Sequence, residues 1–130
     1  MTVTAMNHFT VLAGDLANTQ AFYKELLGLK EGYRPPFDFP GAWLYAGEQA
    51  VLHIIAGREL PKDPAGVLDH MAFSAAGLQD TIAKLERRKI DYLLRRQAGS
   101  RAWQLFFHDP NGAKVELDFA PEEPGPATGD

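Results

Sequence analysis

The sequence contains no cysteine among its 130 residues, which excludes disulfides, thiolate metal ligands and cysteine nucleophiles. It has no excess of positive charge, because 13 Lys and Arg against 17 Asp and Glu give a formal net charge of −4. No apolar run approaches the ~20 residues of a membrane span, and the first residues lack a signal-peptide pattern. Gly-x-Gly phosphate-binding patterns are also absent. These absences predict a cytoplasmic, soluble protein with no nucleic-acid or membrane partner.

The composition that is present is typical of one globular domain. Hydrophobic residues make up 45% of the chain and charged residues 23%, close to the average for soluble proteins. A length of 130 residues also matches a single domain. The segment 121–130 is rich in proline, glycine and acidic residues and has no aromatic residue, so we expect this tail to be disordered.

The chain divides into two halves that repeat one order of predicted elements, over about residues 6–56 and 68–119. His8 and His70 begin the halves, and His53 and Glu116 fall at matching positions near their ends. Alternating side chains and helical periodicity predict βαβββ for each half. The predicted strands are 6–13, 42–46, 50–55, 69–74, 90–95, 102–108 and 113–119, with 32–36 at most an edge strand, and the predicted helices run from a cap at Asn18 or Thr19 to Gly28 and over 78–89.

Four side chains with metal-ligand chemistry lie in the predicted strands, namely His8, His53, His70 and Glu116. Their neighbours along each strand, such as Phe9 and Val11, are hydrophobic and take the opposite face, so the four are expected to point to one concave face. A single mid-strand histidine is often only a hydrogen-bonded structural residue. A chance grouping of all four, however, would bury an unpaired carboxylate. The set therefore predicts a site for divalent Fe, Mn, Ni or Zn.

Other polar and aromatic residues give weaker signals. His108 adjoins the predicted turn 109–112 and is interpreted as a surface or hydrogen-bonded residue. The arginines at 34, 95 and 96 could hold an anionic substrate or lie on the surface. The aromatic residues around Trp43 could line an apolar pocket or belong to the core.

These residues resemble the vicinal oxygen chelate superfamily, which contains glyoxalase I, extradiol dioxygenases, fosfomycin and bleomycin resistance proteins and methylmalonyl-CoA epimerase. The resemblance covers about residues 6–119. The matching segments are Asn7-His8-Phe9-Thr10-Val11, Phe22-Tyr23-Lys24-Glu25-Leu26-Leu27-Gly28, Asp69-His70-Met71-Ala72-Phe73 and Asp109-Pro110-Asn111-Gly112 followed by Val115-Glu116-Leu117. It implies an α+β fold in which two βαβββ modules form a U-shaped mixed sheet with helices on the outer face. It also implies a bound divalent metal and a homodimer.

The resemblance assigns roles to the four candidate residues. His8, His70 and Glu116 correspond to the shared metal ligands. His53 lies where glyoxalase I-like members have a fourth ligand, usually Glu, and near where ring-cleaving members have an acid–base histidine. His53 and Glu116 are therefore the predicted catalytic residues.

The implied function is a metal-dependent enzyme acting on a small substrate that is chelated through vicinal oxygens. The 2-His-1-carboxylate set with an additional histidine favours, by a narrow margin, dioxygenase-type chemistry. Ring-cleaving members carry a tyrosine at the position of Phe106, which departs from that pattern. A glyoxalase-like lyase or isomerase, of the lactoylglutathione lyase or epimerase type, is the first alternative. An antibiotic-resistance protein, fosfomycin-modifying or drug-binding, is the second.

Overall fold

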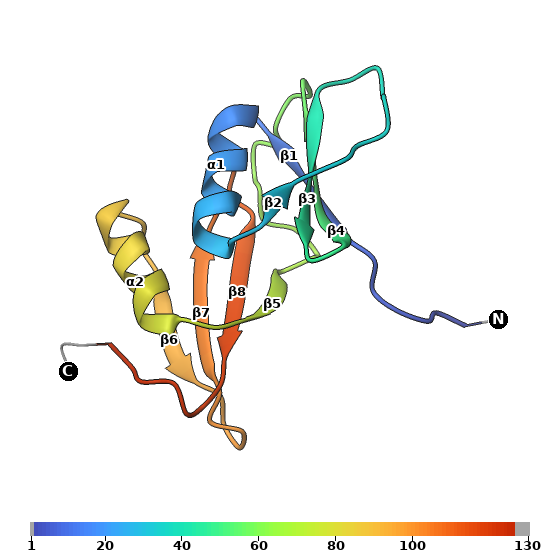
Figure 1. Cartoon of the computed structure of the whole chain (residues 1–130). Helices are drawn as coiled ribbons and strands as arrows, with labels where there is room; N and C mark the ends of the chain where they lie inside the picture. Colours follow the sequence, from blue (N-terminus) through green and yellow to red (C-terminus); the bar gives the residue numbers. More distant parts are fainter. Residues whose placement is uncertain (1, 127–130) are drawn as a thin grey trace. The chain divides into compact units, whose positions relative to one another are not determined.

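The computed structural model describes residues 2–126, in two compact units that join in the chain between Pro64 and Ala65 (Figure 1). Each unit contains one four-stranded mixed sheet and one helix. The α+β class and the repeated βαβββ order are therefore confirmed, while the joining of the two sheets into one U stays a prediction. Within residues 2–126, no helix has the length and apolar character needed to cross a membrane.

The first unit contains β1 (Phe9–Ala13), α1 (Leu16–Leu27), β2 (Lys30–Glu31), β3 (Gly41–Ala46) and β4 (Gln49–Ala56). The sheet order is β1-β4-β3-β2, with β1 parallel to β4 and the other pairs antiparallel. Helix α1 packs against β3 and β4, and its side chains Phe22, Tyr23 and Leu26 are buried. The sheet contributes alternate buried residues such as Leu52 and Ile54, so one face of the sheet is the core.

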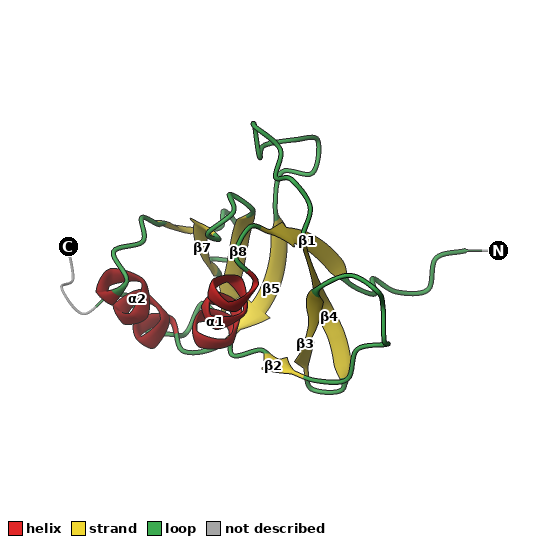
Figure 2. Cartoon of the chain, turned by 90° about the horizontal axis from the view of Figure 1, so that it is seen from above, coloured by secondary structure: helices red, strands yellow, loops and turns green. Residues whose placement is uncertain are grey.

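The second unit contains β5 (Met71–Ala75), α2 (Leu78–Arg87), β6 (Leu93–Arg96), β7 (Trp103–His108) and β8 (Lys114–Phe119). Its sheet order, β5-β8-β7-β6, repeats the order of the first unit, and β5 is parallel to β8. Figure 2 shows α2 and the strands of its unit as separate layers. The buried side chains Leu78, Ile82 and Leu85 recur at helical spacing along α2, which explains why this short segment is helical.

Several element boundaries differ from the sequence prediction for local reasons. Strands β1 and β5 begin at Phe9 and Met71, so the two histidines that precede them lie at the strand entrances. Helix α1 is capped by Asp15, whose carboxylate accepts a hydrogen bond from the Asn18 backbone at 3.0 Å; Asn18 and Thr19 already lie inside the helix. The predicted helix end is confirmed, because Gly28 adopts a left-handed conformation with φ 69°.

The element boundaries near the prolines and at the end of α2 also differ from the prediction. The short strand β2 precedes the predicted edge strand 32–36, where two prolines remove backbone donors. Helix α2 ends at Arg87, because Lys89 has a φ of 57° and turns the chain, and β6 begins only at Leu93.

The start of the C-terminal segment packs against the second unit. The Glu123 carboxylate accepts hydrogen bonds from the backbone N–H groups of Gly77 and Leu78, at the first turn of α2. The indole N–H of Trp103 donates to the Glu123 carbonyl at 2.9 Å. The expectation of disorder from residue 121 is therefore corrected for residues 121–126, and residues 127–130 lie outside the described chain.

Candidate functional site

In the first unit, His53 is the middle ring of a three-ring stack. Strand β4 places it between Thr10 of β1 and Trp43 of β3. The His53 ring stacks on Trp43 with 3.9 Å between centroids and on His8 with 3.7 Å. The residues on either side of His53, Leu52 and Ile54, are buried on the opposite face of the sheet. The His53 side chain therefore points away from the hydrophobic core.

The His53 ring is arranged as a neutral imidazole with an available lone pair. Its Nε2 is buried and has no hydrogen-bond partner among residues 2–126, so its hydrogen bond with the Ala50 backbone uses Nδ1. Burial, followed by the nearby charge of His8, lowers the pKa of His53 below its usual 6.5, while the bond with Ala50 opposes this shift. A histidine that donates Nδ1–H to a backbone carbonyl and presents bare Nε2 has the usual geometry of a metal ligand or a general base.

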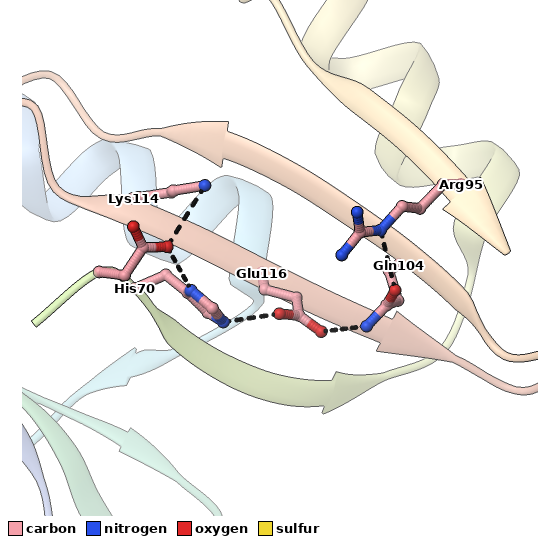
Figure 3. Close-up of polar contacts among 6 residues, drawn as sticks. His70, Arg95, Gln104, Lys114 and Glu116 are labelled. Carbon is pink, nitrogen blue, oxygen red and sulfur yellow. Dashed lines mark hydrogen bonds and ion pairs between the residues drawn. The ribbon is translucent and has the colours of Figure 1, made fainter. Parts of the chain in front are cut away.

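In the second unit, His70 lies between two carboxylates (Figure 3). Its Nε2 is 2.8 Å from Glu116 Oε1, and its Nδ1 is 2.8 Å from Asp69 Oδ2. Asp69 also accepts a hydrogen bond from Lys114 at 3.4 Å. The hydrogen bond from His70, with that from Lys114 second, holds the pKa of the exposed Asp69 carboxyl below its usual value. Asp69 thereby fixes the orientation of the His70 ring.

The Glu116 carboxylate is held on its other oxygen as well. Glu116 is only 5% exposed, and its Oε2 accepts a hydrogen bond from Gln104 Nε2 at 3.1 Å. Gln104 Oε1 in turn accepts from Arg95 Nε at 3.0 Å, so strands β8, β7 and β6 are linked by one hydrogen-bonded chain (Figure 3). A buried carboxylate with both oxygens engaged has a fixed orientation and a supported negative charge.

A second carboxyl group, Asp118, lies beside Glu116 on the same face of β8. Burial first, then the hydrogen bond with Glu116 and its negative charge, raises the pKa of Asp118 to about 6, against an opposing effect of His70. Its Oδ1 is buried without a hydrogen-bond partner within the described chain. The polar face of the second sheet therefore carries two neighbouring carboxyl groups, of which Asp118 has a raised pKa.

The two units place their candidate residues at equivalent register positions. Thr10 on β1 pairs with His53 on β4, and Ala72 on β5 pairs with Glu116 on β8. In each unit, a histidine precedes the first of these strands. On the antiparallel strand next to β4 or β8, the residue paired with His53 or Glu116 is aromatic. These aromatic residues are Trp43 and Phe106. The weak sequence repeat thus corresponds to one repeated arrangement of side chains.

The structure brings the predicted ligands together as two pairs, His8 with His53 and His70 with Glu116. Within residues 2–126, no group of three or more His, Asp and Glu side chains is arranged to hold a metal ion, so the four-residue site stays a prediction. His108 is exposed at the end of β7, as a surface residue would be. The sequence missed the contribution of Gln104, although a polar residue inside the hydrophobic stretch 103–107 was a usable signal.

A pocket in the first unit adjoins the His53 ring, and we call it the aromatic pocket. It is lined mainly by Thr10, Arg34, Phe37, Phe39, Trp43 and His53. The rings of Phe37 and Phe39 stack with 5.2 Å between centroids, and the Phe37 and Trp43 ring centroids are 6.2 Å apart. The sequence left open whether the aromatic residues around Trp43 belong to the core or to a pocket. In the structure, Phe37, Phe39 and Trp43 line this pocket.

Comparisons with known proteins identify the family and the fold. The family model described as Glyoxalase/Bleomycin resistance protein/Dioxygenase superfamily matches residues 5–117. Over 123 aligned residues, the chain is 32% identical to a protein named Glyoxylase I 4 from Arabidopsis thaliana, covering 88% of this chain and 70% of that protein.

Solved structures share the fold. One is a mutant of the genomically encoded fosfomycin resistance protein FosX from Listeria monocytogenes, complexed with Mn(II) and 1S,2S-dihydroxypropylphosphonic acid. It has a TM-score of 0.73 and 16% identity over 92% of this chain and 94% of that chain. A second is lactoylglutathione lyase from Agrobacterium tumefaciens, with a TM-score of 0.62 and 19% identity over 92% of this chain and 96% of that chain. The chain therefore belongs to the Glyoxalase/Bleomycin resistance protein/Dioxygenase superfamily.

Proposed function

We propose that this chain is a metal-dependent enzyme of the glyoxalase type, a lyase or isomerase that moves a proton between adjacent carbons of a small substrate. The observation that carries the proposal is the bare, buried Nε2 of His53 on a ring that burial keeps neutral. Burying a nitrogen without a hydrogen-bond partner costs free energy. A bound cation or an accepted proton would satisfy its lone pair, and both roles suit an imidazole.

We assign His8, His53, His70 and Glu116 as ligands of one divalent metal ion. Their donor atoms are imidazole nitrogens and a carboxylate oxygen, which suit Fe, Mn, Ni or Zn. The supporting contacts are those expected around a metal, because Asp69 orients His70 and Gln104 orients Glu116. When bound, the ion would polarise a substrate oxygen and make the neighbouring C–H bond more acidic.

Two of these residues are also proposed to take part in proton movement. His53 has a lowered pKa, so near pH 7 its Nε2 lone pair is unprotonated; it serves either the metal ion or, in the alternative in which His53 is not a ligand, the proton. Glu116 is the only carboxylate of the four, and Gln104 restrains its Oε2 while Oε1 faces His70. The hydrophobic and aromatic surroundings of His53 would limit access of water to a reacting carbon.

The comparisons support the reaction class that we rank first. The relative named Glyoxylase I 4 and the structural neighbour lactoylglutathione lyase favour proton transfer over the dioxygenase reaction that the sequence narrowly favours. Dioxygenase chemistry is the second candidate, because two histidines, one carboxylate and a neutral additional histidine would also serve it.

One experiment separates these reactions. The protein, loaded anaerobically with Fe, Mn, Ni or Zn, is incubated in D₂O with hemithioacetals of 2-oxoaldehydes, α-hydroxyketones or catechols. We expect NMR to show deuterium entering a carbon next to a carbonyl, with no oxygen consumed. Oxygen uptake with a catechol would replace this proposal by the dioxygenase. Neither signal with any metal and any of these substrates would contradict an enzyme of this kind.

The homodimer implied by the resemblance is part of the proposal. Multi-angle light scattering on the purified full-length chain tests it directly. We expect twice the monomer mass, and a monomer at micromolar concentration would contradict it.

A further inference from the structure

Arg34 in the aromatic pocket is a cation without an anionic partner. Its guanidinium carbon lies 5.0 Å from the ring centroids of both Phe37 and Phe39, and its Nη2 donates a hydrogen bond to the Phe39 carbonyl at 2.8 Å. Within residues 2–126, no carboxylate pairs with it. Because Arg34 is half-buried, water screens its charge less than it screens a fully exposed arginine.

The guanidinium is held in place before any ligand arrives. Pro35, Pro36 and Pro40 restrict the backbone of the loop that carries the two phenylalanines. Gly41 leaves room for the side chain, because a Cβ there would lie 2.9 Å from Arg34 Nη2 and 2.3 Å from the Ile54 carbonyl oxygen. A binding group that is already ordered loses little conformational entropy when a ligand binds.

The walls of the pocket complement this charge with apolar surface. Phe37 is 44% exposed although it is a large hydrophobic residue, and its ring lies between Arg34 and Trp43. Trp43 continues the surface to His53, on which it stacks. A pocket lined by one cation and several aromatic rings matches an organic anion with a flat apolar body.

We infer that the aromatic pocket binds the acidic end of the substrate, a small organic acid whose carboxylate pairs with Arg34. The planar guanidinium can donate two parallel hydrogen bonds to a carboxylate, and the neighbouring rings contact the apolar body. This inference rests on the proposed function in that His53 belongs to the reacting centre, and it adds the substrate class. A neutral substrate of the same shape would leave the Arg34 charge unpaired, so Arg34 is the specificity-determining residue.

The test compares benzoate with its neutral isostere benzamide. Both are titrated into full-length protein, as purified and after chelator treatment, while NMR follows the indole N–H of Trp43. Trp103 is the other tryptophan and serves as an internal control. We expect benzoate to bind about tenfold more tightly than benzamide, with only the Trp43 signal shifting. The preference should fall to about onefold in Arg34→Gln, return partly in Arg34→Lys and stay unchanged in Arg58→Gln, an exposed arginine of the same unit.

Equal affinities for benzoate and benzamide in the unmodified protein overturn the inference, and this outcome does not depend on any variant folding. A benzoate preference that survives Arg34→Gln overturns it as well. The chelator-treated sample separates this result from the proposed function. If the protein never binds metal but still prefers benzoate over benzamide, the subsite stands and the metal enzyme is rejected. If it binds metal but shows no such preference, the metal enzyme stands and the subsite is rejected.

Discussion

Glu116 Oε1 lies 2.8 Å from His70 Nε2, so the two candidate ligands of the second unit are already in direct contact. The same atom of His70 would have to lose its proton before it could bind a metal ion, and the hydrogen bond to Glu116 would then be exchanged for shared coordination. In the first unit, His53, the counterpart of Glu116, has no hydrogen-bond partner at Nε2 within residues 2–126. The two units thus offer complementary half-sets, one of two histidines and one carrying the carboxylate.

His53→Ala tests whether His53 is a ligand. Removing one of four donors should weaken metal binding by at least about tenfold, because the remaining ligands cannot replace the lost nitrogen. Isothermal titration of metal-free protein with Zn²⁺ measures this, and His108→Ala is the matched control with an exposed histidine. Full metal affinity combined with lost activity would make His53 an acid–base residue and remove it from the ligand set.

Gln104→Ala tests the support of Glu116. Without the hydrogen bond to Oε2, the carboxylate is free to rotate, and we expect metal affinity to fall roughly 10–100-fold while the fold is retained. Circular dichroism checks the fold, and the same metal titration measures the affinity. An affinity equal to that of the unmodified protein would show that the orientation of Glu116 does not depend on Gln104.

Asp118→Asn tests the raised pKa of Asp118 in chelator-treated protein. A carboxyl group with a pKa of about 6 in the folded state and 3.8 in the unfolded state binds more protons when folded. Its contribution to stability is therefore complete below pH 3.8 and is lost as the pH rises through 6. An asparagine amide stays neutral and can donate to Glu116, so the variant should gain about 1 kcal/mol over the unmodified protein above pH 6.

Urea unfolding of both proteins between pH 3.5 and 8 measures this difference. The gap in the free energy of unfolding should open as the pH rises from 4 to 7. A gap that does not change with pH would show that Asp118 titrates normally in the folded protein.

Glu123→Ala tests the anchoring of the C-terminal segment. The helix α2 begins after Gly77, which has no side chain to cap it, and Glu123 supplies the carboxylate instead. Loss of these hydrogen bonds and of a negative charge at a helix N-terminus should lower the free energy of unfolding by about 1 kcal/mol. Urea denaturation measures the change. Glu122→Ala, an exposed neighbour, is the control, and equal stabilities of the two variants would contradict the cap.

Much of the fold could be predicted from the sequence because it depends on local patterns. Alternating residues around His53 and Glu116, and the helical spacing in 78–89, determine which faces are buried. The missed features depend on contacts between distant residues. The cap of α2 comes from Glu123, far along the chain, and no local signal in residues 121–126 distinguishes an anchored tail from a disordered one.

The candidate site was predictable to a similar extent. The repeat was sufficient to match His8 with His70 and His53 with Glu116, but the contacts within each unit, His8 with His53 and His70 with Glu116, were not predicted. The stacking of Trp43 on His53 depends on the register of β3 against β4, which no local sequence pattern reveals. The role of Arg34 required the loop 35–40 to be placed, because proline-rich loops have no period from which a contact can be inferred.

The most direct test of the metal centre is the number of metal ions per chain, measured by mass spectrometry on protein purified anaerobically without chelators. We predict about one ion per chain for the unmodified protein and for His108→Ala, and less than a fifth of that for His70→Ala, because a site that loses one protein ligand binds far more weakly. Equal metal content in all three proteins, or none that can be restored by titration, would contradict the assignment of His8, His53, His70 and Glu116 as a metal centre.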